Sequence, residues 1–227
     1  MNEKILKKIV VAIDGPAGAG KSTVARAVAK RTGLPYLDTG ALYRAISWKL
    51  DREGIPADDG EGIKRALANF KLEFSEGRIS ADGIDVTAAI RTPHIDAIVS
   101  PYSARPEVRA ALLELQRAQA VNGLVADGRD MGTVVFPDAE LKIFLTASAE
   151  ERARRRYKER IDRGEKANYD EILKQVIARD EYDMTREIAP LRPAQGCVIL
   201  DSSDMNTDEV TDAISGLVSE FMKQEKK

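Results

Sequence analysis

Short apolar runs alternate along the chain with segments in which apolar residues recur every three or four positions. The first run, Ile9–Ile13, is rich in β-branched residues, which is typical of a strand buried on both faces. Further strands are predicted at Tyr36–Leu37, Leu124–Ala126, Leu141–Leu145 and Val198–Leu200. Helices are predicted at Lys21–Thr32, Ala41–Arg52, Pro106–Ala120, Tyr169–Thr185 and over a last apolar stripe from Val210 to Phe221. This alternation predicts an α/β fold with a parallel sheet and helices on both faces.

Two segments depart from that alternation. Between Phe70 and Ile90, apolar and charged residues alternate around turn residues, which predicts a small antiparallel β-ribbon inserted into the α/β fold. The residues Ser148–Glu151 form a capping-box pattern, which predicts the start of a very basic helix.

Composition excludes several classes of protein. The 227 residues are 43% hydrophobic, and 35 basic side chains nearly balance 37 acidic ones, which argues against disorder and against a general nucleic-acid binder. The single cysteine, Cys197, and the single histidine, His94, exclude an internal disulfide and a Cys- or His-rich metal site. The apolar run near the N-terminus is too short for a signal peptide or a membrane span. We expect a cytoplasmic monomer without nucleic-acid or membrane partners.

A phosphate-binding loop is predicted directly after the first strand. The pattern G-x-x-x-x-G-K-[ST] is matched in full by Gly15, Pro16, Ala17, Gly18, Ala19, Gly20, Lys21 and Ser22, with Thr23 following. Backbone N–H groups and the helix N-terminus would surround the phosphates of ATP, Lys21 would reach the β- and γ-phosphates, and Ser22 would bind Mg²⁺. Asp127 would hold Mg²⁺ through water, the alternative being a solvated turn aspartate. The sequence lacks an Asn-Lys-x-Asp segment and an apolar run ending in Asp-Glu, which disfavours GTPase switches and ATPase motors.

Arginines follow several of the predicted strands and helices. Asp38–Arg44 comes after the second strand and Asp127–Gly132 after the third, where a parallel sheet places its ligands. Arg179, Asp183 and Arg186 are spaced by four and three residues, which predicts one face of a single helix. Arginine binds phosphate oxygens bidentately, and an acceptor that is itself a phosphate needs no general base. A hydroxyl acceptor would instead need a carboxylate such as Asp38, so the arginines alone do not separate a nucleotide acceptor from a small hydroxylated metabolite.

Taken together, the segments Ile13–Ser22, Leu37–Arg44, Ala126–Pro137 and Arg186–Leu191 resemble the bacterial cytidylate kinases. The likeness extends from Lys8 to Ser202, and Ala126–Pro137 is its most specific part. It implies transfer of the ATP γ-phosphoryl group to CMP or dCMP with Mg²⁺. It also implies a three-layer P-loop fold with a five-stranded parallel sheet, a β-ribbon insertion and a short helical lid.

The resemblance also implies which residues form the site. The CMP phosphate and the transferred phosphoryl group would be surrounded by Thr39, Arg44, Arg129, Arg179 and Arg186. Ser100, Arg109 and Asp130 would bind the cytosine, and Asp183 would contact the ribose. The catalytic cations would be Lys21, Arg129, Arg179 and Arg186. Cytosine presents an amino donor where uracil presents an oxygen, so a carboxylate at Asp130 favours CMP and dCMP over UMP.

The resemblance implies one P-loop kinase domain over residues 1–227, with a core at about 1–62, 105–150 and 187–227. The acceptor-site insertion would span about 63–104, and the lid about 151–168 with its following helix to 186. Arg156 and Arg160 are the candidate lid arginines that close over ATP, the alternative being a solvated basic helix face. Two further functions stay open from the residues alone: a kinase of UMP or a hydroxylated metabolite, and a P-loop switch protein that hydrolyses NTP slowly.

Overall fold

The computed structural model describes residues 9–75 and 77–224. The first eight residues of the expected core and Glu76 of the expected ribbon turn lie outside this part. The chain forms two compact units. Unit 1 comprises the described residues up to Leu37, Gln119–Thr185 and those from Ala189 onward, and unit 2 comprises Asp38–Ala118 and Arg186–Ile188.

The sheet of unit 1 has five strands, as predicted. In spatial order they are β2 (Tyr36–Asp38), β6 (Leu124–Gly128), β1 (Val10–Asp14), β7 (Leu141–Thr146) and β8 (Val198–Asp201). The central strand β1 pairs in parallel with β6 and β7, and Ile13 lies opposite Asp127 in that register. The carboxyl ends of β1 and β6 therefore coincide, which places the loop after β1 and Asp127 at one edge of the sheet.

Each strand of this sheet runs at least one residue further at its carboxyl end than the apolar run indicates, and in β1 and β6 the extension buries a carboxylate. β1 includes Asp14 and β6 continues through Asp127 to Gly128, and both acidic side chains are buried. The apolar residues mark the part of each strand that packs in the core, whereas ladder pairing continues over the polar residues that follow.

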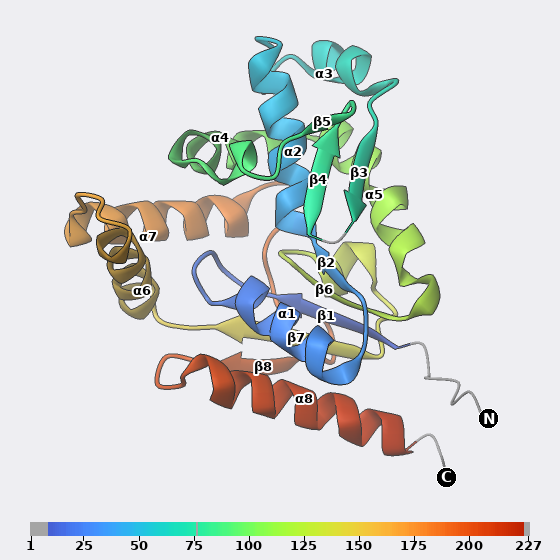
Figure 1. The fold of residues 1–227 in the computed structure, drawn as a ribbon, viewed down its shortest axis with the longest axis vertical. Coiled ribbons are helices and arrows are strands. Elements are labelled where there is room, and N and C mark those ends of the chain that lie inside the picture. Colours follow the sequence, from blue (N-terminus) through green and yellow to red (C-terminus); the bar gives the residue numbers. More distant parts are fainter. Residues whose placement is uncertain (1–8, 76, 225–227) are drawn as a thin grey trace. The chain divides into compact units, whose positions relative to one another are not determined.

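Two helices of unit 1 pack along the sheet. α1 (Lys21–Thr32) has the predicted bounds, and Gly33, at φ +73°, ends it by donating its N–H to the carbonyl of Ala29. α8 (Thr207–Gln224) lies beside α1 (Figure 1), and both bury their apolar faces against β1, β6 and β7. Burial of this continuous apolar cluster is the main stabilising contribution to unit 1.

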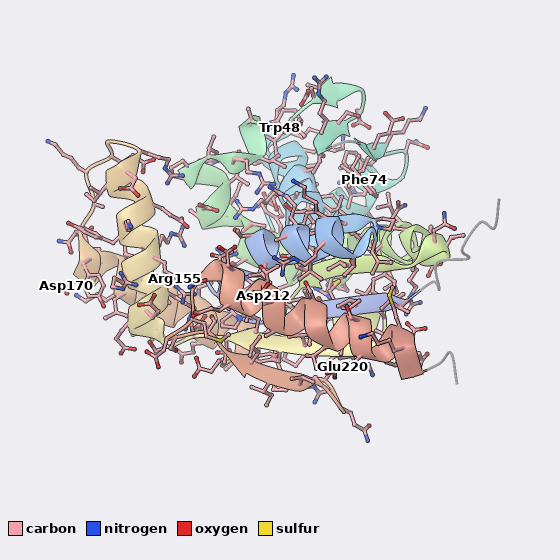
Figure 2. The ribbon with its side chains drawn as sticks, turned by 60° about the horizontal axis from the view of Figure 1, so that its bottom comes forward. Trp48, Phe74, Arg155, Asp170, Asp212 and Glu220 are labelled. Atoms are coloured by element: carbon pink, nitrogen blue, oxygen red, sulfur yellow. The ribbon has the colours of Figure 1, made fainter. Side chains whose placement is uncertain are left out.

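Two more helices of unit 1 pack against each other (Figure 1) around a small core of their own. α6 (Ala149–Asp162) starts as predicted, with the Ser148 hydroxyl accepting from the N–H of Glu151. α7 (Tyr169–Thr185) follows. Figure 2 labels Arg155 on α6, which donates to the backbone carbonyl of Ser202 after β8. Two short turns, η2 (Gln119–Asn122) and η3 (Met131–Val135), flank β6, and η3 is a single π-helical turn.

The prediction that Arg186 shares a helical face with Arg179 and Asp183 is wrong. α7 ends at Thr185, and Arg186 groups with unit 2. Beyond that end the backbone leaves the right-handed helical region, and Ala189, just before Pro190, has φ +50°. The chain instead turns back, and the N–H of Leu191 donates to the carbonyl of Asp183.

Unit 2 combines helices with the predicted antiparallel ribbon. Its elements are α2 (Thr39–Arg52), α3 (Gly60–Leu67), β3 (Leu72–Ser75), β4 (Arg78–Ala81), β5 (Ile84–Asp85), η1 (Ala89–Arg91), α4 (Pro93–Ser103) and α5 (Pro106–Ala118). The strands form an antiparallel sheet in the order β3-β4-β5, and Trp48 and Phe74, labelled in Figure 2, pack on its apolar cluster. No helix in the described ranges is long and apolar enough to span a membrane.

Three helix boundaries in unit 2 are set by side-chain caps. α2 starts at Thr39, two positions before the predicted Ala41, because the Asp38 carboxylate accepts from the N–H of Ala41. Asp59 caps α3 and Thr92 caps α4 in the same way. These last two helices are absent from the sequence prediction, since neither has a long apolar stripe.

Candidate active site

The loop between β1 and α1 packs closely against the neighbouring strand, β7. Gly15 has φ +150°, and a Cβ there would lie 1.9 Å from the carbonyl oxygen of Leu145. A Cβ on Gly18 would lie 3.3 Å from the Cβ of Arg152. The loop backbone thus follows a path that only glycine permits at its first position. The predicted phosphate-binding residues all belong to this loop and the first turn of α1.

Cations gather at the end of this loop. Lys21 is buried, and its ammonium donates to the carbonyl of Pro16 at 2.8 Å. Burial, followed by the positive charges of Arg129 and Arg179, lowers the pKa of Lys21, and the carboxylates of Asp127 and Asp14 oppose that shift. Mutually repelling cations at a phosphate loop favour an anionic ligand, because its charge relieves their repulsion.

Asp127 lies at the centre of a hydrogen-bonded group. The Ser22 hydroxyl donates to one of its carboxylate oxygens and the Tyr36 hydroxyl to the other, each at 2.8 Å. Its exposure of 4% rules out the alternative of a solvated turn aspartate. Hydroxyl and carboxylate oxygens fit Mg²⁺, which combines few protein ligands with water and substrate phosphates. Within the described ranges no group of three or more His, Cys, Asp or Glu side chains could hold a metal ion.

Arg129 and Asp183, which the sequence analysis assigns to different parts of the substrate, contact each other. The Arg129 Nε donates to Asp183 Oδ2 at 2.9 Å, and Asp183 is 3% exposed. Arg179 lies one turn earlier on the same helix, α7. The carboxylate therefore orients the guanidinium that the sequence analysis expects on the transferred phosphoryl group.

Asp130 and the following turn are held by a residue that the sequence analysis misses. Asp130 is buried immediately before η3. The Asp14 carboxylate accepts from the N–H groups of Met131 and Gly132, at 2.8 and 2.7 Å. Burial raises the pKa of Asp14 to about 6. The available signal was a carboxylate inside a buried strand directly before the loop, because a buried charge requires partners.

The remaining acceptor residues belong to unit 2, and most lie on packed helices. Thr39 and Arg44 are on α2, Ser100 is on α4 and Arg109 is on α5, and these three helices contact one another. Arg186 belongs to the same unit. Unit 2 thus brings together one part of the predicted acceptor site, and unit 1 holds Lys21, Ser22, Asp127, Arg129, Asp130, Arg179 and Asp183.

The arginines of this part of the site have protein partners. Arg44 forms an ion pair with Asp96. The Arg109 guanidinium donates to the carbonyl of Ser103 and lies 5.5 Å from the centre of the Tyr43 ring. Both contacts fix an otherwise flexible side chain, which lowers the entropic cost of binding a ligand.

On α6, the candidate lid residues Arg156 and Arg160 are both half-buried. One turn before Arg156 lies Arg152, a second residue that the sequence analysis misses. Arg152 is 4% exposed and donates to the carbonyls of Ala17 and Ala147 and to the carboxylate of Asp180. A single arginine in a basic run gives no sequence signal of such a role.

A parallel sheet, a phosphate loop and clustered cations together define a P-loop nucleotide-binding protein. The family model for cytidylate kinase matches residues 11–220, so the chain belongs to the cytidylate kinase family. It is 50% identical over 205 residues to the "Cytidylate kinase" of Carboxydothermus hydrogenoformans, covering 88% of this chain and 92% of that protein. It is 48% identical to the "Cytidylate kinase" of Thermosipho africanus, covering 94% and 96%.

A solved structure shares the fold. An uncharacterized protein from Eubacterium ventriosum superposes with a TM-score of 0.52 at 13% identity, covering 94% of this chain and 99% of that one. At that identity the likeness concerns the fold alone.

Proposed function

We propose that this chain transfers the γ-phosphoryl group of ATP to CMP or dCMP, giving ADP and CDP or dCDP. Membership of the cytidylate kinase family supports the reaction. The observation that carries the mechanism is the buried Lys21 ammonium, which donates to the Pro16 carbonyl within the phosphate loop and whose pKa is lowered by burial and by the charges of Arg129 and Arg179. Phosphoryl transfer depends mainly on alignment and charge neutralisation, and these cations supply both.

The donor phosphates bind at the loop after β1. Its N–H groups and the N-terminus of α1 face the phosphate oxygens, and Lys21 moves from the carbonyl of Pro16 to the β- and γ-phosphates. Ser22 and Asp127 would hold Mg²⁺, which supplies neutralisation of phosphate charge when bound. Tyr36 fixes the carboxylate of Asp127 by its hydrogen bond.

The acceptor phosphate is its own nucleophile. A CMP phosphate oxygen carries negative charge at neutral pH, so no side chain has to remove a proton. Its bond to the γ-phosphorus forms as the bond from that phosphorus to the bridging oxygen breaks, and ADP leaves with the electron pair. Thr39, Arg44 and Arg186 bind the acceptor phosphate, and Arg129 and Arg179 neutralise the transferred group.

Cytosine selection falls to Ser100, Arg109 and Asp130, and Asp183 contacts the ribose. The Asp130 carboxylate accepts from the cytosine amino group, and uracil would set an oxygen against it. The unpaired acceptors cost about 1–3 kcal/mol, which favours CMP by roughly fivefold to 150-fold. Closure of Arg156 and Arg160 over ATP excludes water as a competing acceptor.

A general base on Asp38 is disfavoured by its contacts. One of its oxygens accepts from the N–H of Ala41 at 2.9 Å and the other from Arg91 at 2.8 Å. Both carboxylate oxygens of Asp38 thus already serve the protein, one as the cap of α2 and the other as the partner of Arg91, whereas a phosphate acceptor needs no such base.

Release of ADP from ATP–Mg²⁺ tests the proposal, with CMP, dCMP, UMP, AMP, dTMP and no acceptor as parallel reactions. We expect strong turnover with CMP and dCMP. Equal turnover with UMP would show that the enzyme does not select cytosine and acts on both pyrimidine nucleotides. Turnover no greater than the acceptor-free blank would contradict the proposal and leave a switch protein or a metabolite kinase.

A further inference from the structure

The carboxylate of Asp14 joins two catalytic loops of unit 1. It is 3% exposed at the last position of β1, and Gly15 of the phosphate loop follows it. Its Oδ1 accepts from the N–H of Met131 and its Oδ2 from the N–H of Gly132. Both donors lie just after Arg129 and Asp130, so one side chain is bonded to the turn that carries these two residues.

The turn depends on external acceptors. The first N–H groups of any helical turn have no partner within it, and Asp14 provides one for Met131 and one for Gly132. The carbonyl of Asp130 accepts from the N–H groups of Val134 and Val135. The backbone on both sides of the Asp130 side chain is thereby fixed, and single π-helical turns of this kind occur frequently at functional sites.

The other end of the connection is also rigid. Gly15 cannot shift toward β7, because its backbone already lies against the carbonyl of Leu145. Asp14 is paired with Gly128 of β6 in the sheet register. The backbone of Asp14 is therefore held between the close-packed phosphate loop and its partner strand β6. Because its carboxylate is bonded to Met131 and Gly132, Asp14 sets the position of their turn relative to the phosphate loop.

A carboxylate suits this position better than its neutral isostere. Asparagine offers one acceptor oxygen, and its amino group would face one of the two N–H donors. Burial of the charged group is costly and raises the pKa of Asp14 to about 6. The two hydrogen bonds accepted from Met131 and Gly132 offset part of the cost of burying the charge, and only a carboxylate offers both acceptors.

We propose that Asp14 is a positioning residue that holds Arg129 and Asp130 in register with the phosphate loop. The inference rests on the roles proposed above for Arg129 and Asp130. Asp14 touches neither ATP nor CMP in this scheme, and it acts through the backbone of Met131 and Gly132.

The test compares Asp14→Asn with Thr211→Val, a control that removes a buried hydroxyl on α8, remote from both loops in the sequence. Steady-state kinetics give kcat/KM for CMP and KM for ATP, and thermal unfolding gives stability. We expect Asp14→Asn to lower kcat/KM for CMP about tenfold or more. KM for ATP should rise by a smaller factor than KM for CMP, because the backbone donors that lose their acceptor belong to the turn that carries Arg129 and Asp130. A value of kcat/KM for CMP within about twofold of the control overturns the inference.

Gly132→Ala provides a second variant if Asp14→Asn does not fold. Its Cβ would lie 3.4 Å from Asp14 Oδ2 and 3.1 Å from the Cβ of Ala194, so it displaces the turn and leaves the carboxylate in place. We expect a smaller loss of the same kind, with KM for CMP raised. Unchanged kinetics with CMP would count against Asp14 as strongly as an unaffected Asp14→Asn variant.

The variant Asp130→Ala separates this inference from the proposed function. If it leaves the CMP/UMP ratio unchanged, the cytosine-binding role fails, and the effect of Asp14→Asn on kcat/KM for CMP still decides the inference. If both single variants lower that parameter, the double variant should lose less than the sum of the two. Full additivity contradicts positioning through Asp130.

Discussion

The guanidinium of Arg152 binds both carboxylate oxygens of Asp180, at 3.0 and 2.6 Å, and donates at 3.0 Å to the carbonyl of Ala17 in the phosphate loop. In a trans peptide unit the carbonyl and the next N–H point in opposite directions. Arg152 therefore turns the N–H of Gly18 away from itself. One buried ion pair thus links α6, α7 and the phosphate loop within unit 1.

Removal of this arginine should weaken both stability and ATP binding. Arg152→Ala leaves Asp180 without its bidentate partner, which we expect to cost about 3 kcal/mol in the free energy of unfolding. KM for ATP should rise because the Ala17 carbonyl is released. The matched control is Arg154→Ala, whose side chain is 64% exposed and pairs with Glu151, and which should leave the unfolding midpoint close to that of the wild type. Urea unfolding of both variants measures the difference, and equal losses would contradict the structural role.

Replacement of Asp130 should reduce discrimination between pyrimidines. Asp130→Ala removes the carboxylate that accepts from the cytosine amino group, so the ratio of kcat/KM for CMP to that for UMP should fall by about tenfold. Asp138→Ala, an exposed aspartate on the same segment, is the control and should keep the wild-type ratio. An unchanged ratio in Asp130→Ala would remove this residue from base recognition.

Activity should depend on the protonation of Asp14. Burial raises its pKa to about 6, Asp130 adds to this, and the N–H groups of Met131 and Gly132 together with Lys21 oppose it. Below that pH one oxygen carries a proton and no longer accepts. The CMP phosphate itself titrates near pH 6, and this affects the wild type and Asp14→Asn equally. The measured quantity is therefore the ratio of kcat/KM for CMP in the wild type to that in Asp14→Asn, in which the titration of the substrate cancels. This ratio should fall toward unity from pH 7.5 to about 5.5, whereas a constant ratio would exclude Asp14 as the titrating group.

Stability should respond in the opposite direction. The folded-state pKa of Asp14, about 6, lies above its ordinary value of 3.8, so the folded protein binds this proton more readily than the unfolded chain. Relative to Asp14→Asn, wild-type stability should therefore increase as the pH falls from 7 to 5, by about 1 kcal/mol. Urea unfolding of both proteins at the two pH values checks the sign.

The Tyr36 hydroxyl should contribute to stability through Asp127. Tyr36→Phe removes the hydroxyl group, and with it the 2.8 Å hydrogen bond to Asp127, and keeps the ring. We expect this change to lower the free energy of unfolding by about 1 kcal/mol. Tyr182→Phe, on a side chain that is 40% exposed, is the control and should cost less than about 0.5 kcal/mol. The midpoint of chemical unfolding measures both, and equal midpoints would show that the hydroxyl of Tyr36 is not needed to hold Asp127.

Local sequence patterns predict the sheet and the phosphate loop well. The phosphate loop is predictable because all of its signals lie within one short segment: the apolar run before Gly15, the glycines and Lys21. Their spacing along the chain is enough to identify the loop. Helix boundaries are less certain because single side chains move them, as Asp38 does for α2. The spacing of Arg179, Asp183 and Arg186 is helical, yet α7 ends at Thr185, because regular spacing of three residues does not show where a helix stops.

Contacts between distant segments were not predictable in the same way. Asp14 and Gly132 are 118 residues apart in the sequence, and Arg129 and Asp183 are 54 apart. The first apolar run ends at Ile13, and a charged residue directly after such a run gives no local sign that it is buried. Only the folded chain shows that the carboxylate is buried and why burial is tolerated.

The steric environment of the phosphate loop also sets what an engineered library can explore. At position 15 any side chain would overlap the carbonyl oxygen of Leu145, so no substitution there is compatible with this loop conformation. Position 20 differs: its φ of +86° is uncommon for other residues, yet no atom lies within 4 Å of the Cβ that a substitution would add. Asparagine and aspartate tolerate that backbone best among the other residues, so the protein itself leaves room for a side chain at the last glycine of the loop and excludes one at the first.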